Sequence, residues 1–202
     1  MQFVEAYATE DAVAQTARLL ADEVGVGSVS PAAGSALRLM AAASNAKAVV
    51  EIGTGAGVSG LWLLRGMRPD GVLTTIDVEA EHQRIARRLF QQAGFSASRT
   101  RVIAGRALDV LPRLADGAYD LVLVDADPTE AGDCVGAAGR LLRAGGVVAV
   151  HGVLTGGRIA DPAARDQDTV ARRELTKNVR ESDIWVSALL PVGDGLLTAI
   201  RR

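Results

Sequence analysis

One acidic residue and three glycines lie close together over a short stretch in the first third of the chain. Residues 48–59 read AVVEIGTGAGVS, so an apolar run reaches Glu51 and then meets Gly53, Gly55 and Gly57. Glycine tolerates positive φ and has no Cβ, so such a loop turns sharply and lets a ligand lie against its backbone. A carboxylate two residues ahead of the loop would repel a pyrophosphate, which the usual G-x-G-x-x-G loop binds. The stretch therefore favours a ligand with positive charge and no phosphate.

A second acid lies where such a ligand would need it. Residues 72–77, VLTTID, read as a strand that ends in Asp77, 26 residues after Glu51. This spacing is close to that of a ribose-binding acid in a strand-loop-helix-strand unit. S-adenosylmethionine has a sulfonium, an ammonium and two vicinal ribose hydroxyls, so it matches both acids. The alternative is an ordinary turn in which Asp77 is solvated.

Composition limits the class of protein. The 202 residues are 49% hydrophobic with a net charge of −2, which predicts a single domain over residues 1–202 with a proper core. Within it we expect a helical lead-in over 1–46 and the core over 47–202. A pI near 5.7 gives no electrostatic footprint for nucleic acid. No long apolar run and no basic leader are present, so we expect a cytoplasmic protein without a membrane segment.

The pattern of the remaining chain predicts the fold. Two helices, over 10–24 with Thr9 as N-cap and over 31–44, precede the first strand and are expected at one sheet edge or at the ligand mouth. Strands and helices then alternate along the chain. After the first strand, further strands are expected at 72–77, 100–104, 119–126 and 146–151. The helices between them are expected over about 58–66, 79–93 and 108–114, with a last one that ends at about residue 142. The strands are nearly continuous apolar runs, which is typical of a parallel sheet covered on both faces. Residues 184–200 read as an antiparallel hairpin. The fold class is therefore α/β, a Rossmann-like class I methyltransferase fold with seven strands, mostly parallel.

Four motifs in this order resemble a known family. They are SPAAG at 30–34, EIGTGAGVS at 51–59, TTID at 74–77 followed by Val78, and YDLVLVDAD at 119–127. From about residue 29 to the end, the chain resembles the small O-methyltransferases that include the catechol and caffeoyl-CoA O-methyltransferases, a class I S-adenosylmethionine-dependent family.

The resemblance implies roles for residues of the glycine loop. Val29 and Glu51 would contact the methionine part of S-adenosylmethionine or its surroundings. Gly53, Thr54 and Ser59 would line the cofactor, and the Ser59 hydroxyl would partner its carboxylate. Ser59 could instead be a first-turn serine that bonds its own backbone.

The resemblance extends to the ends of the later strands. Asp77 would hold the ribose hydroxyls and Val78 would pack on the adenine. Asp125 would lie between the cofactor amine and the substrate, with Asp127 close by. The alternative for Asp125 and Asp127 is a strand-end pair without function, although open α/β sheets bind ligands at these ends.

The chain departs from the family's metal-assisted members. Those members follow the D-A-D motif with lysine and end the fifth strand with Asp-Asn, two ligands of a divalent ion. This chain has Pro128 and His151-Gly152 at those places. Magnesium and calcium need several oxygen ligands, so we expect no tightly bound divalent metal.

A base is still needed to remove the proton of a phenol or alcohol. His151, at the carboxyl end of the fifth strand beside Asp125, is the candidate because its ordinary pKa is about 6.5. It could instead bond a loop carbonyl or ligate a softer metal. His82 is expected on a solvated helix face. The charged residues of the loop over 152–169 could cover the substrate or form surface ion pairs.

These residues predict a methyltransferase that moves a methyl group from S-adenosylmethionine to a hydroxyl of a small-molecule acceptor, without a divalent metal. The resemblance implies a homodimer. Two alternatives stay open. One is a catalytically silent protein that binds S-adenosylmethionine or S-adenosylhomocysteine, since Pro128 and His151 depart from the family. The other is a nicotinamide-dependent oxidoreductase, since a glycine loop with a ribose acid is shared with that class.

Overall fold

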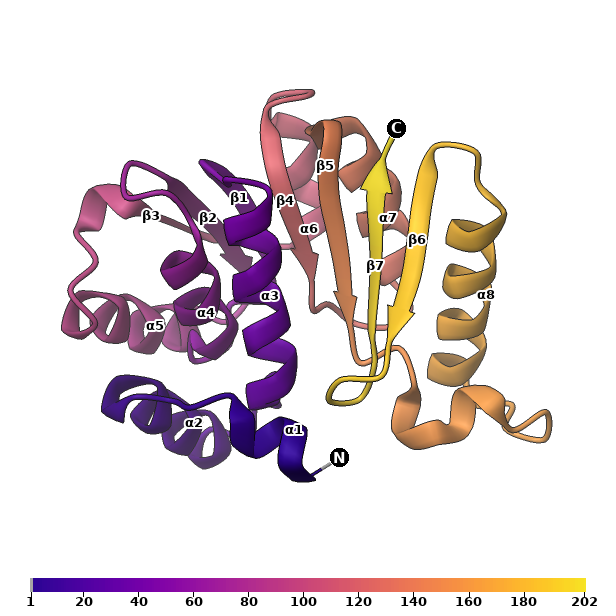
Figure 1. Cartoon of the computed structure of the whole chain (residues 1–202), viewed down its shortest axis with the longest axis horizontal. Helices are drawn as coiled ribbons and strands as arrows, with labels where there is room; N and C mark the ends of the chain where they lie inside the picture. The colour runs from indigo at the N-terminus through magenta and orange to yellow at the C-terminus, as the bar shows by residue number, and fades with distance from the viewer. Residues whose placement is uncertain (1) are drawn as a thin grey trace.

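A seven-stranded sheet forms the centre of the molecule in the computed structural model, which describes residues 2–202 (Figure 1). The strand order is β3-β2-β1-β4-β5-β7-β6. The strands are β1 (Ala48–Ile52), β2 (Val72–Asp77), β3 (Thr100–Ala104), β4 (Tyr119–Val124), β5 (Leu142–His151), β6 (Trp185–Leu190) and β7 (Leu196–Arg201). The first five strands pair in parallel, and β7 pairs antiparallel with both β5 and β6. The predicted fold class and terminal hairpin are confirmed.

Helices cover both faces of this sheet (Figure 1). The α-helices are α1 (Gln2–Tyr7), α2 (Ala12–Glu23), α3 (Pro31–Ala43), α4 (Val58–Gly66), α5 (Ala80–Gln92), α6 (Ala107–Val110), α7 (Ala131–Leu141) and α8 (Gln167–Glu181). One core cluster packs helices α2, α3, α4 and α5 against one face of the sheet. A second cluster packs α6, α7 and α8 against the other face. Within residues 2–202, no helix is long and apolar enough to cross a membrane.

The central strands β1 and β4 are mostly apolar because both of their faces are buried. In β1, Val49 packs into the first cluster and the next residue, Val50, packs into the second, and neither is exposed to solvent. Successive strand side chains point to opposite faces, so a strand between two helical layers needs no polar alternation. Acidic residues lie at the carboxyl ends of three of these strands: Glu51 near the end of β1, Asp77 at the end of β2 and Asp125 directly after β4.

The lead-in helices differ in detail from the prediction. Thr9 was expected as the N-cap of the first helix, but Asp11 is the N-cap of α2, and its side chain accepts a hydrogen bond of 2.9 Å from the Ala14 amide. The expectation was wrong because α2 begins at Ala12, so Asp11 and not Thr9 directly precedes it, and Asp is also the stronger N-cap type. The short helix α1 was not expected at all.

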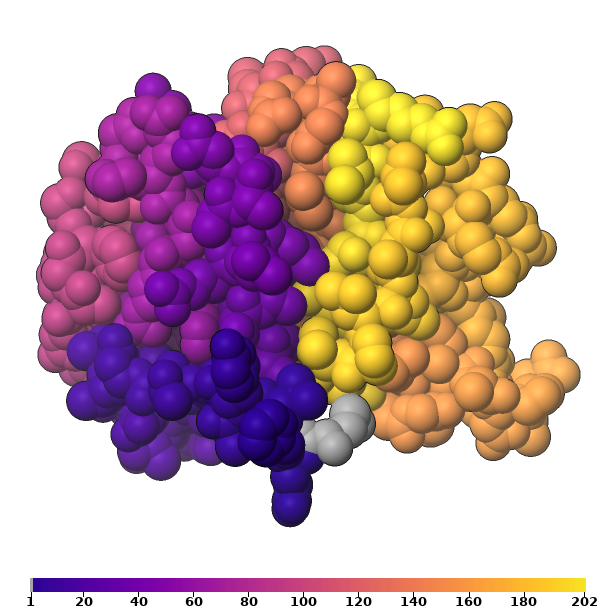
Figure 2. Space-filling model, viewed as in Figure 1, coloured from indigo at the N-terminus to yellow at the C-terminus, as the bar shows by residue number. Residues whose placement is uncertain are grey.

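The position of α1 and α2 matters for the site. Both helices lie at the edge of the sheet where the parallel strands end, and they are coloured indigo in Figures 1 and 2. Glu10, just before α2, accepts hydrogen bonds from Arg18 at 2.6 Å and from the Trp62 indole at 3.2 Å. This anchoring holds the segment between α2 and α3, residues 24–30, three of which line a cleft at the ends of the strands.

Candidate functional site

A cleft of about 390 Å³ lies at the carboxyl ends of β1, β2 and β4. Six predicted site residues line it: Gly53, Thr54, Ser59, Asp77, Asp125 and His151. A second cleft of about 240 Å³ adjoins it and shares the lining residues Gly53, Asp77 and Asp125. The two clefts therefore meet along one ridge, where an elongated ligand could span both.

Backbone geometry requires glycine at the start of the loop. Gly53 has φ of 93°, and a Cβ placed there would overlap the carbonyl oxygen of Asp125. Its amide donates a 2.9 Å hydrogen bond to the carbonyl of Ile76, so the loop is pinned between β2 and the end of β4. Gly57 has φ of 91° at the N-cap of α4, where the chain turns into the helix. These backbone angles and contacts therefore define the shape of the loop.

Asp77 is held in a fixed orientation at the junction of the two clefts. Its Oδ2 accepts a 2.9 Å hydrogen bond from the Gly55 amide and its Oδ1 accepts one of 2.9 Å from the Glu79 amide. Each carboxylate oxygen has a second lone pair that these bonds leave free. Asp77 can therefore accept two further hydrogen bonds from vicinal hydroxyls without moving.

Glu51 lies behind the wall of the cleft. It is fully buried, and Ser59 Oγ donates a 2.6 Å hydrogen bond to its Oε1, while Oε2 has no partner among the described residues. Burial raises the pKa of Glu51 to about 7, against the hydrogen bond from Ser59, which lowers it. The carboxyl group is therefore balanced between its neutral and charged forms near neutral pH.

His151 and Asp125 form a hydrogen-bonded pair in the wall of the cleft. Val124 pairs with Val150 in the parallel β4–β5 ladder, so the next residue of each strand comes to the same level. His151 Nδ1 lies 3.0 Å from Asp125 Oδ1. A carboxylate only accepts, so the proton of a neutral imidazole lies on Nδ1 and the lone pair lies on Nε2.

The environment of His151 favours its protonated form. Burial lowers the pKa of His151, but the hydrogen bond and the charge of Asp125, with the charge of Asp194, outweigh this effect and raise the pKa above 6.5. The Arg172 charge acts in the opposite direction. The ring is half-buried, so it can still exchange a proton with a group in the cleft.

Four predicted residues lie outside the first cleft. Val78 and Asp127 line the second cleft, where Val78 is 60% exposed and Asp127 Oδ1 accepts a 2.8 Å hydrogen bond from the Thr129 amide. Val29 is buried in the core, and its neighbours Val26 to Ser28 line the first cleft instead. Glu51 reaches the cleft only through Ser59, as described above.

The side chains near Asp125 do not fit a magnesium or calcium site. Asp125 already accepts a hydrogen bond from His151, while Pro128 and Gly152 add no side-chain oxygen. Among residues 2–202, no three His, Cys, Asp or Glu side chains converge as metal ligands would. A hard divalent ion needs several oxygen ligands together, and this donor set does not provide them.

Sequence reasoning missed part of the site. His82 was expected on a solvated helix face, yet it is half-buried and lines the first cleft, because α5 starts directly after the Asp77 turn. Val26, Gly27 and Ser28 also line the first cleft, and they lie between the two predicted lead-in helices, where no site residue was predicted. No motif pointed to them, since their place depends on how the lead-in helices pack.

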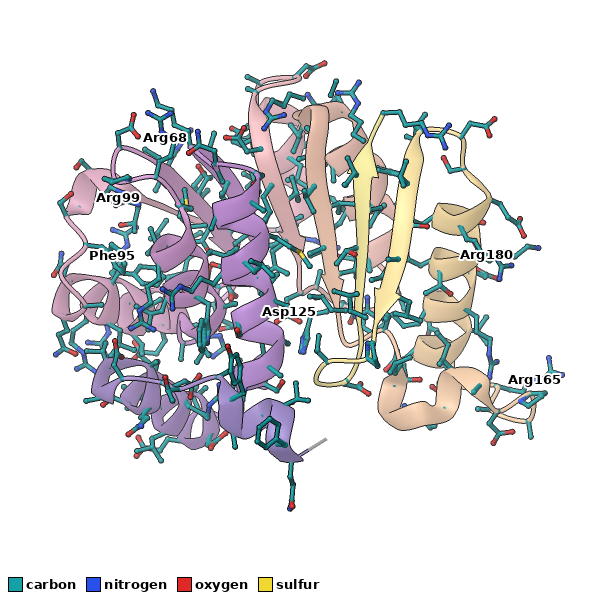
Figure 3. All side chains as sticks on the ribbon, in the orientation of Figure 1. Arg68, Phe95, Arg99, Asp125, Arg165 and Arg180 are labelled. Carbon is teal, nitrogen blue, oxygen red and sulfur yellow. The ribbon has the colours of Figure 1, made fainter. Side chains whose placement is uncertain are left out.

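The loop after β5 forms surface ion pairs. Arg158 Nη2 lies 3.7 Å from Asp166 Oδ1, and both side chains are substantially exposed. Arg165 lies at the outer end of this loop, away from Asp125 (Figure 3). Arg173 of α8 donates hydrogen bonds of 2.8 Å to the carbonyls of Ile159 and Ala164. These contacts tie the loop to α8.

Comparison with known proteins places this site in a family. The profile of the O-methyltransferase family matches residues 5–202, which include every residue that lines the two clefts. The Mycobacterium tuberculosis protein Rv1220c, named a probable O-methyltransferase, is 54% identical over 193 residues, which are 96% of this chain and 86% of that protein.

Two solved structures are similar over nearly the whole chain. A Corynebacterium glutamicum protein has a TM-score of 0.92 at 37% identity, with 98% of this chain and 94% of that chain covered. The O-methyltransferase TomG from Streptomyces achromogenes, involved in tomaymycin synthesis and solved in complex with SAM, has a TM-score of 0.89 at 30% identity, with 99% of this chain and 94% of that chain covered.

Proposed function

The chain belongs to the O-methyltransferase family, and on that premise we propose that its cleft transfers a methyl group from S-adenosylmethionine to a hydroxyl of a small-molecule acceptor, with His151 as the base. The observation that carries this proposal is the 3.0 Å hydrogen bond between His151 Nδ1 and Asp125 Oδ1 in the wall of the cleft. The S-adenosylmethionine-bound relative supports the choice of methyl donor.

The donor would lie along the ridge that the two clefts share. Asp77 would accept hydrogen bonds from both ribose hydroxyls, since its two oxygens are already oriented by the Gly55 and Glu79 amides. The adenine would lie in the second cleft beside Val78, and the methionine part would lie in the first cleft beside Thr54 and Ser59. This placement directs the cationic end of the donor toward Asp125 and toward Glu51 behind Ser59.

S-adenosylmethionine, when bound, supplies a methyl group on a positively charged sulfur. Transfer would form a bond from the acceptor oxygen to the methyl carbon and break the bond from that carbon to sulfur. The proton of the acceptor hydroxyl would pass to Nε2 of His151. Asp125 would stabilise the resulting imidazolium through the hydrogen bond to Nδ1. Alignment of donor and acceptor in the cleft contributes much of the acceleration, up to about 7–11 kcal/mol in well-oriented intramolecular reactions.

The family and the relatives favour a methyltransferase over a nicotinamide-dependent oxidoreductase. Among methyltransferase folds, a catalytically silent binder of the same ligand is the remaining alternative. Turnover separates the two, because a silent binder would hold the donor and yield no methylated product.

Calorimetric titration of the metal-stripped protein with S-adenosylmethionine, S-adenosylhomocysteine and NAD tests the proposal. We expect micromolar binding of both adenosyl ligands and none of NAD, followed by methyl transfer to members of a panel of phenols and alcohols. Binding of NAD alone would overturn the assignment of Glu51 and Asp77. Binding of the adenosyl ligands without turnover on any acceptor would support the silent binder.

Assembly and location complete the proposal. We propose a homodimer in the cytoplasm. In support of self-association, the edge strand β6 exposes Val186 and Leu189, and the adjacent β7 exposes Ile200. An exposed apolar edge strand is a surface that proteins commonly cover. Sedimentation at micromolar concentration should give twice the chain mass, and V186K should shift it to the monomer.

A further inference from the structure

Arg172 is a buried cation close to the proposed base. Its side chain belongs to α8, the residue is only 4% exposed, and its Nε and Nη1 have no hydrogen-bond partner among the described residues. A buried guanidinium without a paired carboxylate is costly. Arginine stays charged in proteins, so this charge must be balanced by its surroundings.

The one hydrogen bond of this guanidinium goes to the turn after β4. Arg172 Nη2 donates to the carbonyl oxygen of Ala126 at 3.3 Å. Ala126 lies between Asp125 and Asp127, so Arg172 contacts the backbone that carries both carboxylates. The bond joins α8 to a turn 46 residues earlier in the chain, and it restrains the side chain that orients His151.

The charges of carboxylates from three segments act on this cation. Burial lowers the pKa of Arg172, and the charges of Asp125, Asp127, Asp168 and Asp194 raise it. They come from the turn after β4, from the first turn of α8 and from the loop between β6 and β7. Arg172 therefore offsets the negative charge of these four carboxylates.

We propose that Arg172 is a positioning residue of the methyl-transfer site, which holds the turn from Asp125 to Asp127 and supplies the fixed positive charge that balances the acidic groups around His151. The inference rests on the proposed role of His151 as base. The groups that face His151 are Asp125 from the end of β4, Asp194 from the β6–β7 loop and Arg172 from α8. Only Arg172 among them opposes protonation of the ring.

The test measures the His151 titration directly. The chain has two histidines, so NMR resolves both imidazole signals, and the H151Q variant assigns them. R172Q should raise the pKa of His151 by about 0.5–1 pH unit, as removal of a nearby charge does, while His82 stays unchanged. R172K, which keeps the charge but not the guanidinium fork, should keep the His151 pKa near its wild-type value.

Activity provides the second readout. R172Q should lower kcat about tenfold through misplacement of the base and leave KM for S-adenosylmethionine within about twofold. The acid limb of its kcat/KM profile should shift to higher pH by the same amount as the His151 pKa measured by NMR. The matched control is R180Q. Arg180 lies on the same helix, exposed and bonded only to its neighbour Glu181, and far from Asp125 in Figure 3. It should change neither readout.

Two outcomes would overturn the proposal: a His151 pKa in folded R172Q equal to that of the wild type, or an equal shift in R180Q. If R172Q does not fold, R172K decides. In R172K, a lowered kcat with an unchanged His151 pKa would support the positioning role. A wild-type kcat together with a wild-type His151 pKa in R172K would end it. The NMR arm needs no methyl acceptor, so failure of the proposed function is distinguishable from failure of this inference.

Discussion

Ser59 Oγ donates a 2.6 Å hydrogen bond to Oε1 of Glu51, whose other oxygen is buried without a partner among the described residues. The helix α4 thus closes the cleft over a carboxyl group that water does not reach. Burial is the largest effect on this group, and it raises the pKa of Glu51 from 4.5 to about 7. A cationic ligand in the cleft would favour the ionised form again, which couples ligand binding to proton release.

Glu51 should make stability depend on pH. The folded state holds a proton on Glu51 up to about pH 7, and the unfolded state releases it near pH 4.5. The stabilisation is therefore complete below pH 4.5 and is lost as pH rises through 7, by about 3 kcal/mol in total. Urea unfolding from pH 5 to 8 should show that the wild type loses stability relative to E51Q over this range.

The exposed Glu174 gives the matched control. E174Q should follow the wild type at each pH. A constant difference between wild type and E51Q from pH 5 to 8 would contradict the raised pKa of Glu51. Calorimetry of S-adenosylmethionine at pH 6 in two buffers should also show proton release by the wild type and none by E51Q.

Asp77 should determine affinity for the adenosyl ligands. D77N removes the carboxylate that would accept hydrogen bonds from both ribose hydroxyls. Its side-chain NH2 group cannot accept the hydrogen bond from the Gly55 amide. We expect S-adenosylhomocysteine to bind about 10–100-fold more weakly, since hydrogen bonds to a charged group are worth about 1.5–3 kcal/mol. Calorimetry measures this. D70N, an exposed loop carboxylate that does not line the cleft, should bind as the wild type does.

His151 should control turnover and its pH dependence. H151Q should lower kcat by about 10²–10⁴-fold, as expected for loss of a general base, with S-adenosylmethionine affinity nearly unchanged. The raised pKa of His151 places the acid limb of the wild-type kcat/KM profile above pH 6.5, because the base acts only when neutral. Undiminished turnover of H151Q across pH 6 to 9 would remove His151 from the mechanism.

Gly53 should not tolerate a side chain. G53A puts a Cβ into the carbonyl oxygen of Asp125 and holds alanine at positive φ, so the free energy of unfolding should fall by about 2–4 kcal/mol. G132A is the control, because Gly132 is an exposed residue of α7 with open space around its Cβ position. Chemical denaturation should show G132A at or above wild-type stability. Equal stability of both variants would contradict the close approach of the loop to the end of β4.

Removal of divalent metal should leave the reaction intact. The side chains around Asp125 do not form an oxygen-rich donor set, so turnover after treatment with EDTA should stay within about twofold of the untreated rate, and added magnesium should not increase it. Turnover is measured at fixed ionic strength so that salt effects do not enter. A large and saturable gain with magnesium would show that another donor arrangement exists.

Much of the fold was available from local pattern. The strands predicted at 72–77 and 119–126 are the parallel strands β2 (Val72–Asp77) and β4 (Tyr119–Val124), which are mostly buried between the two helical layers. The hairpin predicted over 184–200 is present as β6 and β7, and its turn contains Gly193 and Gly195, both with positive φ. The start of α2 was predicted wrongly because Thr9 and Asp11 lie close together and can both cap a helix.

The sequence by itself determined which groups the strands deliver to the carboxyl edge of the sheet: Glu51, Asp77, Asp125 and His151. It did so because a parallel sheet brings strand ends to one edge. Only the tertiary structure decided how they are used. Packing buried Glu51 and raised its pKa, the β4–β5 register brought His151 to Asp125, and the docking of α8 placed Arg172 behind them. Burial and long-range charge depend on segments far apart in the chain, so no local pattern contains them.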